Sequence, residues 1–169
     1  MPQTAIGRGY TQYSYPDDDT PDEYAVYSAF LDYVLVDGSR LHVNQTDCYC
    51  PRCQRIDMAE HIETVEQLQI RLQQLRLLDS EERKIAEFIG SIPDQIVELS
   101  KRIAWRKTRQ SPAKCLHCGC IEIVLLPTDD EFAHPVTGAR MTVAGRGFMS
   151  TVEWHATYTP EGDVIESSE

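Results

Sequence analysis

The chain has 169 residues, 16 of them basic and 27 acidic, and its formal net charge at pH 7 is −11. Hydrophobic residues make up 41% and charged residues 25%, which is typical of a globular protein and excludes collagen, a coiled-coil rod and a wholly disordered chain. The length fits one domain, or one domain with an elaborated insertion.

The charge is distributed unevenly along the chain. Residues 48–121 carry a net charge of +2, between flanks of −6 (residues 1–47) and −7 (residues 122–169). An acidic protein repels the phosphates of nucleic acids at long range, so any nucleic-acid role would lie in the middle segment. No stretch approaches about 18 consecutive apolar residues, and the N-terminus lacks the apolar core of a secretory signal, so we expect a cytoplasmic protein without a membrane span.

The N-terminal part combines an acidic segment with a helix start. Residues 1–19 are polar and include a run of aspartates, so we expect a flexible acidic segment. Thr20-Pro21-Asp22-Glu23 offers a capping residue, a proline in the first turn and a glutamate at the third helical position. It predicts a helix from Pro21 to about Leu35, although the tyrosines and valines here also allow a strand. Residues 40–44 are expected to form a short strand.

The six cysteines form two tight clusters, each with a C-x-x-C pair. The first cluster is Cys48-Tyr-Cys50-Pro-Arg-Cys53 and the second is Cys115-Leu-His-Cys118-Gly-Cys120. Four thiolates from two such pairs are what a tetrahedral Zn²⁺ site requires, because each corner turns both sulfurs toward one ion. Proline stiffens the first turn, and glycine supplies a positive φ after the second. The predicted ligands of one structural Zn²⁺ are Cys50, Cys53, Cys115 and Cys118.

The Cys-Pro-x-Cys and Cys-x-x-Cys-Gly corners resemble the knuckles of zinc-ribbon and rubredoxin-like proteins. This resemblance is confined to the two corners, and it implies a structural four-sulfur site without any particular activity. The chain departs from the pattern in the 61 residues between Cys53 and Cys115, far more than a plain ribbon needs.

Other interpretations of the cysteines stay open. Six is an even number that fits disulfide bonds, and an iron centre or a redox-active dithiol would use the same pairs. The chain is long enough to build a core without disulfides, which favours zinc. Cys48 and Cys120 are buried small side chains, additional metal ligands or an oxidisable pair. His117 and His42 are alternative ligands.

Residues 57–108 show the period of amphipathic helices. One apolar stripe runs from Met58 to Leu75 and another from Ile85 to Ile103, each with gaps of three and four residues. Asp79 with Glu82 predicts a new helix start between the stripes. The expected structure is an antiparallel helical hairpin, held at both ends by the metal and projecting roughly 30 Å from it.

The position of the turn follows from the lengths of the two arms. A turn near residues 78–80 gives arms of similar length, particularly if the second arm kinks at Gly90–Pro93, whereas a turn near Gly90 gives unequal arms. Some apolar residues lie off both stripes and need another surface, either the protein's own sheet or a second copy. These residues are Ile70, Leu77, Phe88 and Trp105.

The returning arm ends in basic residues, with no acid between Glu98 and Glu122. As a nucleic-acid surface this run would contact phosphates. As a structural feature it would supply the cations that a helix C-terminus favours. The candidate nucleic-acid contacts are Lys101, Arg102, Arg106, Lys107 and Arg109.

The C-terminal third predicts mainly strands. Residues 121–126 are β-branched and apolar and predict a strand, and residues 127–138 predict a loop. Residues 140–144 and 148–158 predict two strands that turn at Gly145-Arg-Gly147. A last short strand is expected at 163–165, after a turn at 159–162.

The expected fold is therefore α+β: a small antiparallel sheet and an N-terminal helix, with an antiparallel helical hairpin inserted between two zinc knuckles. Residues 20–166 would form one zinc-pinned domain that includes the hairpin at 57–108. A short tail would follow at 167–169.

The sequence favours a binding role over catalysis. No G-x-S-x-G, phosphate-binding glycine loop or H-E-x-x-H motif occurs. His61-Ile-Glu63 with the second cysteine pair matches the zinc-deaminase motif only in part. Four cysteine ligands would also leave no position on the zinc for a catalytic water. We expect no enzyme and no catalytic residues, but a protein-interaction or assembly module that binds a partner or a second copy through the hairpin. The alternative is a nucleic-acid-binding protein that uses residues 101–114.

Overall fold

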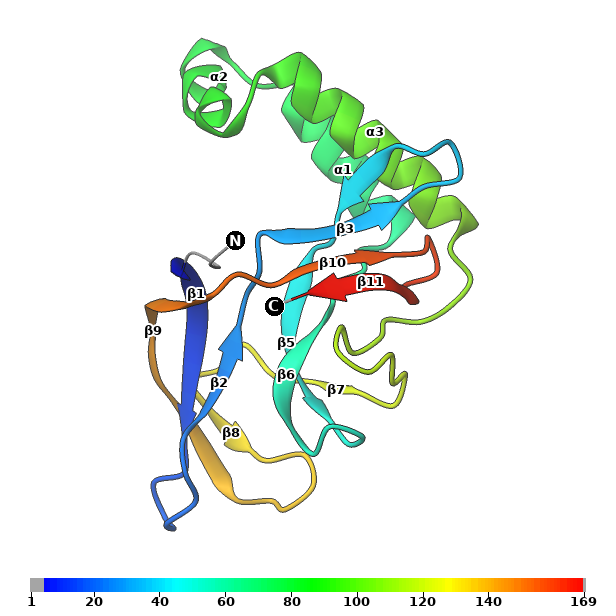
Figure 1. The fold of residues 1–169 in the computed structure, drawn as a ribbon. Helices are drawn as coiled ribbons and strands as arrows, with labels where there is room; N and C mark the ends of the chain where they lie inside the picture. The colour runs from blue at the N-terminus through cyan, green and yellow to red at the C-terminus, as the bar shows by residue number, and fades with distance from the viewer. Residues whose placement is uncertain (1–4, 169) are drawn as a thin grey trace.

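The structure is a computed structural model that describes residues 5–168 (Figure 1). This part of the chain forms three β-sheets and an arm of three α-helices, which lie together in the middle of the sequence. Among these residues, no helix has the length and apolar character needed to cross a membrane.

The first sheet has the strand order β2-β1-β9-β8. β1 (Ala5–Ser14) and β9 (Arg140–Val152) pair antiparallel at its centre, and β2 (Glu23–Val26) and β8 (Glu131–Ala133) form the edges. The register of β1 against β9 shifts between Gln12 and Tyr13, which marks a bulge.

The second sheet continues from the first and has the order β11-β10-β3-β4. Its strands are β3 (Phe30–Val34), β4 (Arg40–His42), β10 (His155–Tyr158) and β11 (Val164–Ser168), and β3 runs parallel to β10. Since β2 leads into β3 and β9 into β10, two chain segments cross together from one sheet to the next. The main core includes Leu31, Tyr33, Met141, Trp154 and Tyr158.

The third sheet carries the first cysteine pair. β5 (Gln45–Cys50) lies between β6 (Arg55–Glu60) and β7 (Val124–Leu125), antiparallel to both. The turn from β5 to β6 therefore contains residues 51–54, and β6 leads directly toward the helical arm.

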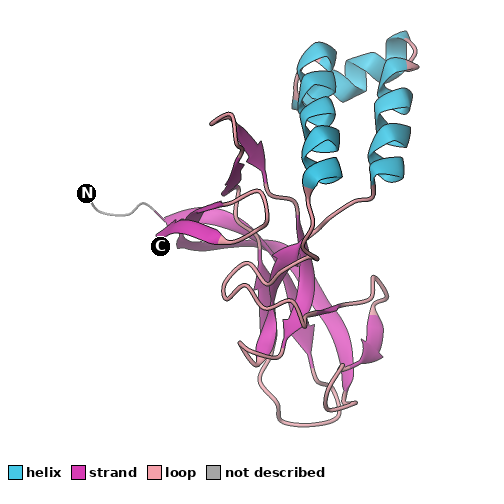
Figure 2. Cartoon of the chain, turned by 90° about the vertical axis from the view of Figure 1, so that its right-hand side faces the viewer, coloured by secondary structure: helices cyan, strands magenta, loops and turns pink. Residues whose placement is uncertain are grey.

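The arm consists of α1 (Val65–Arg76), α2 (Ser80–Ala86), a 3₁₀ turn at Glu87–Ile89 and α3 (Ile92–Thr108). Thr64 and Asp79 cap α1 and α2 with full capping boxes. Figure 2 shows α1 and α3 standing off the sheets side by side, with α2 across their far end. A small core of Leu68, Leu99 and Ile103 holds α1 to α3.

The arm differs from the expected hairpin in two respects. Residues 57–60 belong to β6, so the helical part starts only at Val65. The chain also turns twice, after α1 at residues 77–79 and again at Gly90, where φ is 144°. Each of the two turns considered from the sequence is thus real, and α2 connects them.

The N-terminal helix predicted from Pro21 to Leu35 is wrong, because this stretch forms β2 and β3. Alternate residues such as Leu31 and Tyr33 are buried, so cross-strand pairing prevails over the local capping pattern. The segment 1–19, expected to be flexible, contains β1, while residues 1–4 lie outside the described residues.

The β-structure is also more extensive than the small antiparallel sheet that the sequence predicts. The predicted turn at Gly145-Arg-Gly147 is wrong, since β9 passes through it without a break. A Cβ atom on Gly147 would lie 3.3 Å from the Tyr10 hydroxyl, so glycine here makes room for a neighbouring ring. The predicted loop at 127–138 contains β8, and β11 extends to Ser168, into the expected tail.

Candidate metal centre

The first cysteine pair lies in the tight turn between β5 and β6. The backbone N–H of Cys53 donates to the sulfur of Cys50 at 3.4 Å. Gln54 follows with a φ of 55°, a conformation that is uncommon outside glycine. This conformation reverses the chain immediately after Cys53, so that β6 can start at Arg55.

The second cysteine pair is held against β6 by backbone hydrogen bonds. Glu60 N–H donates to Lys114 O at 3.0 Å, and Leu116 N–H donates to Met58 O at 3.0 Å. Gly119 N–H donates to Cys115 O at 2.9 Å, and its φ of 75° confirms the predicted positive value. Gly119 and Gln54 occupy equivalent positions, because each directly follows the last cysteine of its C-x-x-C pair.

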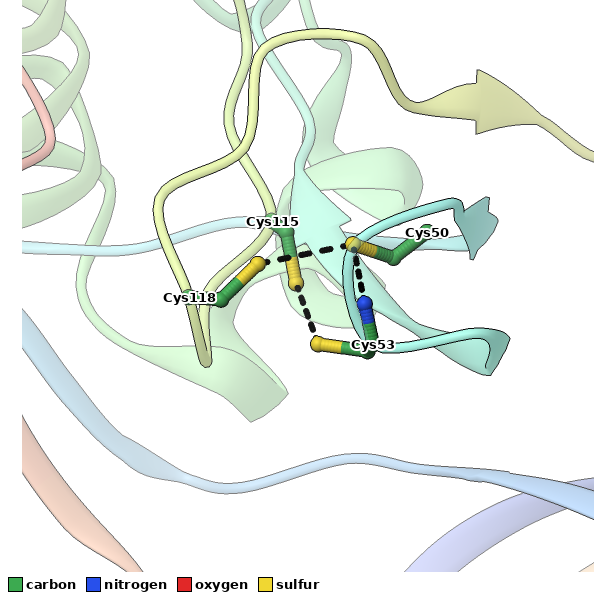
Figure 3. Close-up of side chains that lie close together, drawn as sticks. All are labelled: Cys50, Cys53, Cys115 and Cys118. Atoms are coloured by element: carbon green, nitrogen blue, oxygen red, sulfur yellow. Dashed lines mark hydrogen bonds between the residues drawn. The ribbon is translucent and has the colours of Figure 1, made fainter.

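The two turns bring four sulfurs together, those of Cys50, Cys53, Cys115 and Cys118 (Figure 3). All four Sγ atoms lie within 4.8 Å of one another. The Cys50–Cys118 distance is 3.4 Å and the Cys53–Cys115 distance is 3.9 Å. A tetrahedron of sulfurs about 2.3 Å from a central zinc has edges of about 3.8 Å. The spacing is therefore consistent with a structural zinc site.

The disulfide interpretation does not fit this geometry. All six cysteines are free thiols. The Cys50–Cys118 and Cys53–Cys115 sulfur distances of 3.4 and 3.9 Å are well beyond the roughly 2.05 Å of an S–S bond.

Burial acts on the pKa of three of the four thiols. Burial raises the pKa of Cys53 to about 12 and raises the pKa of Cys115 as well. Burial acts in the same direction on Cys118, but hydrogen bonds from the Cys120 backbone and from the other sulfurs lower its pKa. Thiols in such surroundings become thiolates when a divalent ion compensates the buried charge.

His117 packs beside the second turn and is not a member of the four-sulfur group. Its Nδ1 lies 2.6 Å from Oδ1 of Asp57, and its ring stacks on Trp154 with centroids 4.2 Å apart. Burial would raise the pKa of Asp57, yet its contact with His117 and the Met58 N–H hold that pKa below its usual value.

Arg52 connects the two turns. Its Nη1 donates to the carbonyl oxygen of Cys118 at 2.9 Å. The sequence places Arg52 inside the first turn but gives no indication of its partner 66 positions away, so its role was not predicted.

Cys48 and Cys120 lie in the same buried cluster as the four thiols but outside the four-sulfur group. Burial raises the pKa of Cys48 to about 12. Both side chains pack in the interior, and an additional metal or redox role remains a prediction. His42 also lies outside the four-sulfur group, and its carbonyl oxygen accepts from Arg102 at 2.7 Å.

Arg109, a candidate nucleic-acid contact, has a fully buried side chain. Its two terminal nitrogens donate to the two carboxylate oxygens of Glu60, each at 2.8 Å. Glu60 also accepts from the Tyr33 hydroxyl and from the Lys114 N–H. Burial, together with the Glu60 carboxylate, raises the pKa of Tyr33 well above its ordinary value. This network lies at the base of the arm.

Three other basic candidates bind backbone oxygens of the chain. Lys101 donates to Arg40 O at 3.2 Å, Arg102 to His42 O at 2.7 Å and Arg106 to Glu63 O at 2.9 Å. Lys107 is exposed. Four of the five candidates thus bond to other groups of the chain near the base of the arm.

Comparisons of the chain with protein-family models, with curated proteins and with solved structures found no match. Its function is therefore inferred from its own geometry.

Proposed function

We propose that the chain is a non-enzymatic zinc-binding protein that acts as a protein-interaction or assembly module through its helical hairpin. The far end of the arm carries this proposal. α2 and the 3₁₀ turn have no buried residue. Four large apolar side chains gather there, which we call the apolar tip: Leu77 (82% exposed), Ile85 (71%), Phe88 (89%) and Ile89 (85%).

Exposure on this scale is unusual for a protein surface. Single exposed apolar residues are common, but a cluster of them marks a contact site for another molecule. Of the apolar residues that lie off the two stripes, Ile70 is exposed like Phe88, whereas Trp105 is buried against the body. The apolar residues that need a partner thus lie toward the far end of the arm.

The base of the arm is suited to hold this tip in a fixed position. Trp105 Nε1 donates to Pro160 O at 2.9 Å. The carboxylate of Glu161 accepts from the N–H groups of Gln110 and Ser111 at 3.0 and 2.8 Å. The chain leaves the body after Glu60 and returns beside it, directly before the second cysteine pair.

A zinc ion bound by the four cysteines would fix this base. Structural zinc contributes roughly 10–16 kcal/mol in small peptides, as much as the net stability of a domain. Four sulfur ligands would complete its tetrahedral shell, which leaves no position for a reacting water and supports a structural role.

The nucleic-acid alternative has less support. Lys101, Arg102 and Arg106 bind carbonyl oxygens within the chain, and the guanidinium of Arg109 is fully buried. Groups engaged in this way contribute little to a phosphate-binding surface.

A photo-crosslinking experiment tests the proposal. A benzophenone side chain is placed at Phe88 in the tip or, as a control, at Phe148, which is 83% exposed on the body. We expect zinc-dependent protein crosslinks at position 88, lost in Cys53→Ser and absent at position 148. Equal labelling at both positions contradicts the proposal. Salt-sensitive DNA or RNA binding that is lost on reversing the charge of Arg106 and Lys107 would support the alternative.

A further inference from the structure

A groove of about 660 Å³ runs along α1 and α3, from Ile89 and Gly90 at the far end of the arm to His42 and Asn44 on the body. Its apolar lining comes from Leu75, Leu78, Ile89 and Leu99. The volume is in the range of sites that accommodate ligands or several side chains. Charged side chains of both signs, including Arg71, Asp94 and Glu98, complete its walls.

A ridge of apolar side chains stands beside this groove. Ile85 near the end of α2, and Phe88 and Ile89 in the 3₁₀ turn that follows it, are spaced i, i+3, i+4 and are between 71% and 89% exposed. Amphipathic helices that bind in grooves use this spacing for their anchors. Ile89 belongs to both features, since it also lines the groove.

We propose that the partner of the apolar tip is a second copy of this chain, and that each copy inserts its Ile85–Ile89 ridge into the groove of the other. The inference rests on the proposed function and names its partner. One chain presents both a ridge and a groove, side by side, and its own ridge does not occupy its own groove. In a twofold dimer both grooves are occupied, because the same surface patch of each copy faces that of the other and each ridge enters the opposite groove.

The distribution of charge favours contact through the arms. Residues 61–110 carry nine basic and eight acidic side chains, while the rest of the chain carries seven basic and nineteen acidic. The net charge is thus +1 for the arm and −12 for the rest, so two copies repel one another much less through their arms than through their bodies. α2 also carries both signs, with Glu81 and Glu82 before Arg83 and Lys84, which matches the mixed charges around the groove.

The number of contacts favours a twofold pair over the insertion of a single ridge. A standard interface buries roughly 800 Å² on each partner, and the largest apolar patch of an ordinary monomer is roughly 300–600 Å². Each dimer would contain two ridge–groove contacts, so every copy contributes both its tip and the walls of its groove.

Sedimentation velocity of the full zinc-loaded chain, from low micromolar to submillimolar concentrations, tests the dimer. We expect a monomer–dimer equilibrium that Phe88→Glu weakens by about 30-fold or more, the size of a hot-spot loss. Phe148→Glu is the matched control at a similarly exposed phenylalanine of the body, and it should leave the dimer unchanged. A wild-type chain that is monomeric throughout, or a dimer insensitive to Phe88→Glu, overturns the proposal.

A mixing experiment tests the ridge-in-groove geometry. Gln74 is exposed on α1 and lines the groove, so Gln74→Trp fills the groove without disturbing the core. We expect each variant alone to be monomeric, and a mixture of Phe88→Glu with Gln74→Trp to form a heterodimer, because one ridge and one groove remain intact. A wild-type dimer without this rescue would overturn the geometry. A monomeric wild type that still gives crosslinks from position 88 to other proteins would overturn the second copy but leave the proposed function standing.

Discussion

The two ends of the helical arm use their side chains in opposite ways. At the base, Trp105 and Arg109 are buried, and their polar atoms bind the body. At the far end, Phe88 and Ile89 are among the most exposed apolar side chains of the described residues. Both ends belong to one stretch of continuous chain.

If the tip is the contact surface proposed above, stability and contact are separated along the arm. Bonds of buried polar side chains hold the base, whereas the apolar side chains of the tip are exposed. Changes at the base should therefore unfold the protein, and changes at the tip should alter only what it binds. Four substitutions test this division, from the largest expected effect to the smallest.

Replacement of a zinc ligand should have the largest effect. Cys53→Ser removes one of four thiolates, so we expect loss of most bound zinc, and destabilisation by several kcal/mol that leaves the protein heat-labile or insoluble. Elemental analysis and thermal unfolding followed by circular dichroism measure both. Cys48→Ser is the control and should keep one zinc per chain, since Cys48 lies outside the four-sulfur group. Wild-type zinc content and melting in Cys53→Ser would refute the structural role.

Loss of the buried ion pair at the base should come next. Arg109→Ala leaves the carboxylate of Glu60 buried without its bidentate partner, a change that typically costs about 3–5 kcal/mol. Arg106→Ala removes a single hydrogen bond to a carbonyl and should cost about 1 kcal/mol. Urea unfolding at pH 7 compares the two variants. Equal losses would mean that the base does not depend on this pair.

A change at the tip should leave the fold intact. Phe88→Glu alters a side chain that is 89% exposed, so we expect a change in unfolding free energy within about 0.5 kcal/mol at concentrations where the chain is monomeric. Leu99→Ala, in the core between α1 and α3, should cost about 2–5 kcal/mol by comparison. A large loss in Phe88→Glu would show that the tip is part of the fold.

The smallest effect concerns pH. Hydrogen bonds from Ser111 and the Gln110 N–H lower the pKa of Glu161 to about 2. A lowered folded pKa stabilises the protein above the unfolded value of about 4.3, and this contribution disappears as the pH falls toward about 2. Because Glu161 is partly exposed, we expect Glu161→Gln to cost about 0.3 kcal/mol at pH 7 and almost nothing at the acid limit. A cost that is independent of pH would contradict this assignment.

The features that were predicted correctly depend on local spacing. The cysteine pairs and the glycine after Cys118 specify their turn without reference to the rest of the chain. The capping box that starts at Asp79 and the apolar stripes of α1 and α3 are likewise local. Local hydrogen bonds and helix periodicity are visible in a sequence because partners lie within a few positions of one another.

The features that were missed depend on distant partners. Thr20–Glu23 satisfies the local pattern for a helix start, but β2 pairs with β1 through residues ten to sixteen positions away. Gly147 resembles a turn residue until its neighbour Tyr10 is known. In the sequence Arg109 resembles an exposed cation, but its guanidinium binds Glu60, which lies 49 positions earlier in the chain.

The hydrogen bond between Glu60 N–H and Lys114 O has a further consequence. The chain leaves the β-structure at Glu60 and returns to it at Lys114. The 53 residues between them contain helices and no strand, so the arm is an insertion between β6 and β7. In topological terms the arm is modular: its length or tip could change without altering the order of strands in any sheet. One residue near its root resists such change, because Arg109 neutralises a carboxylate that belongs to the body.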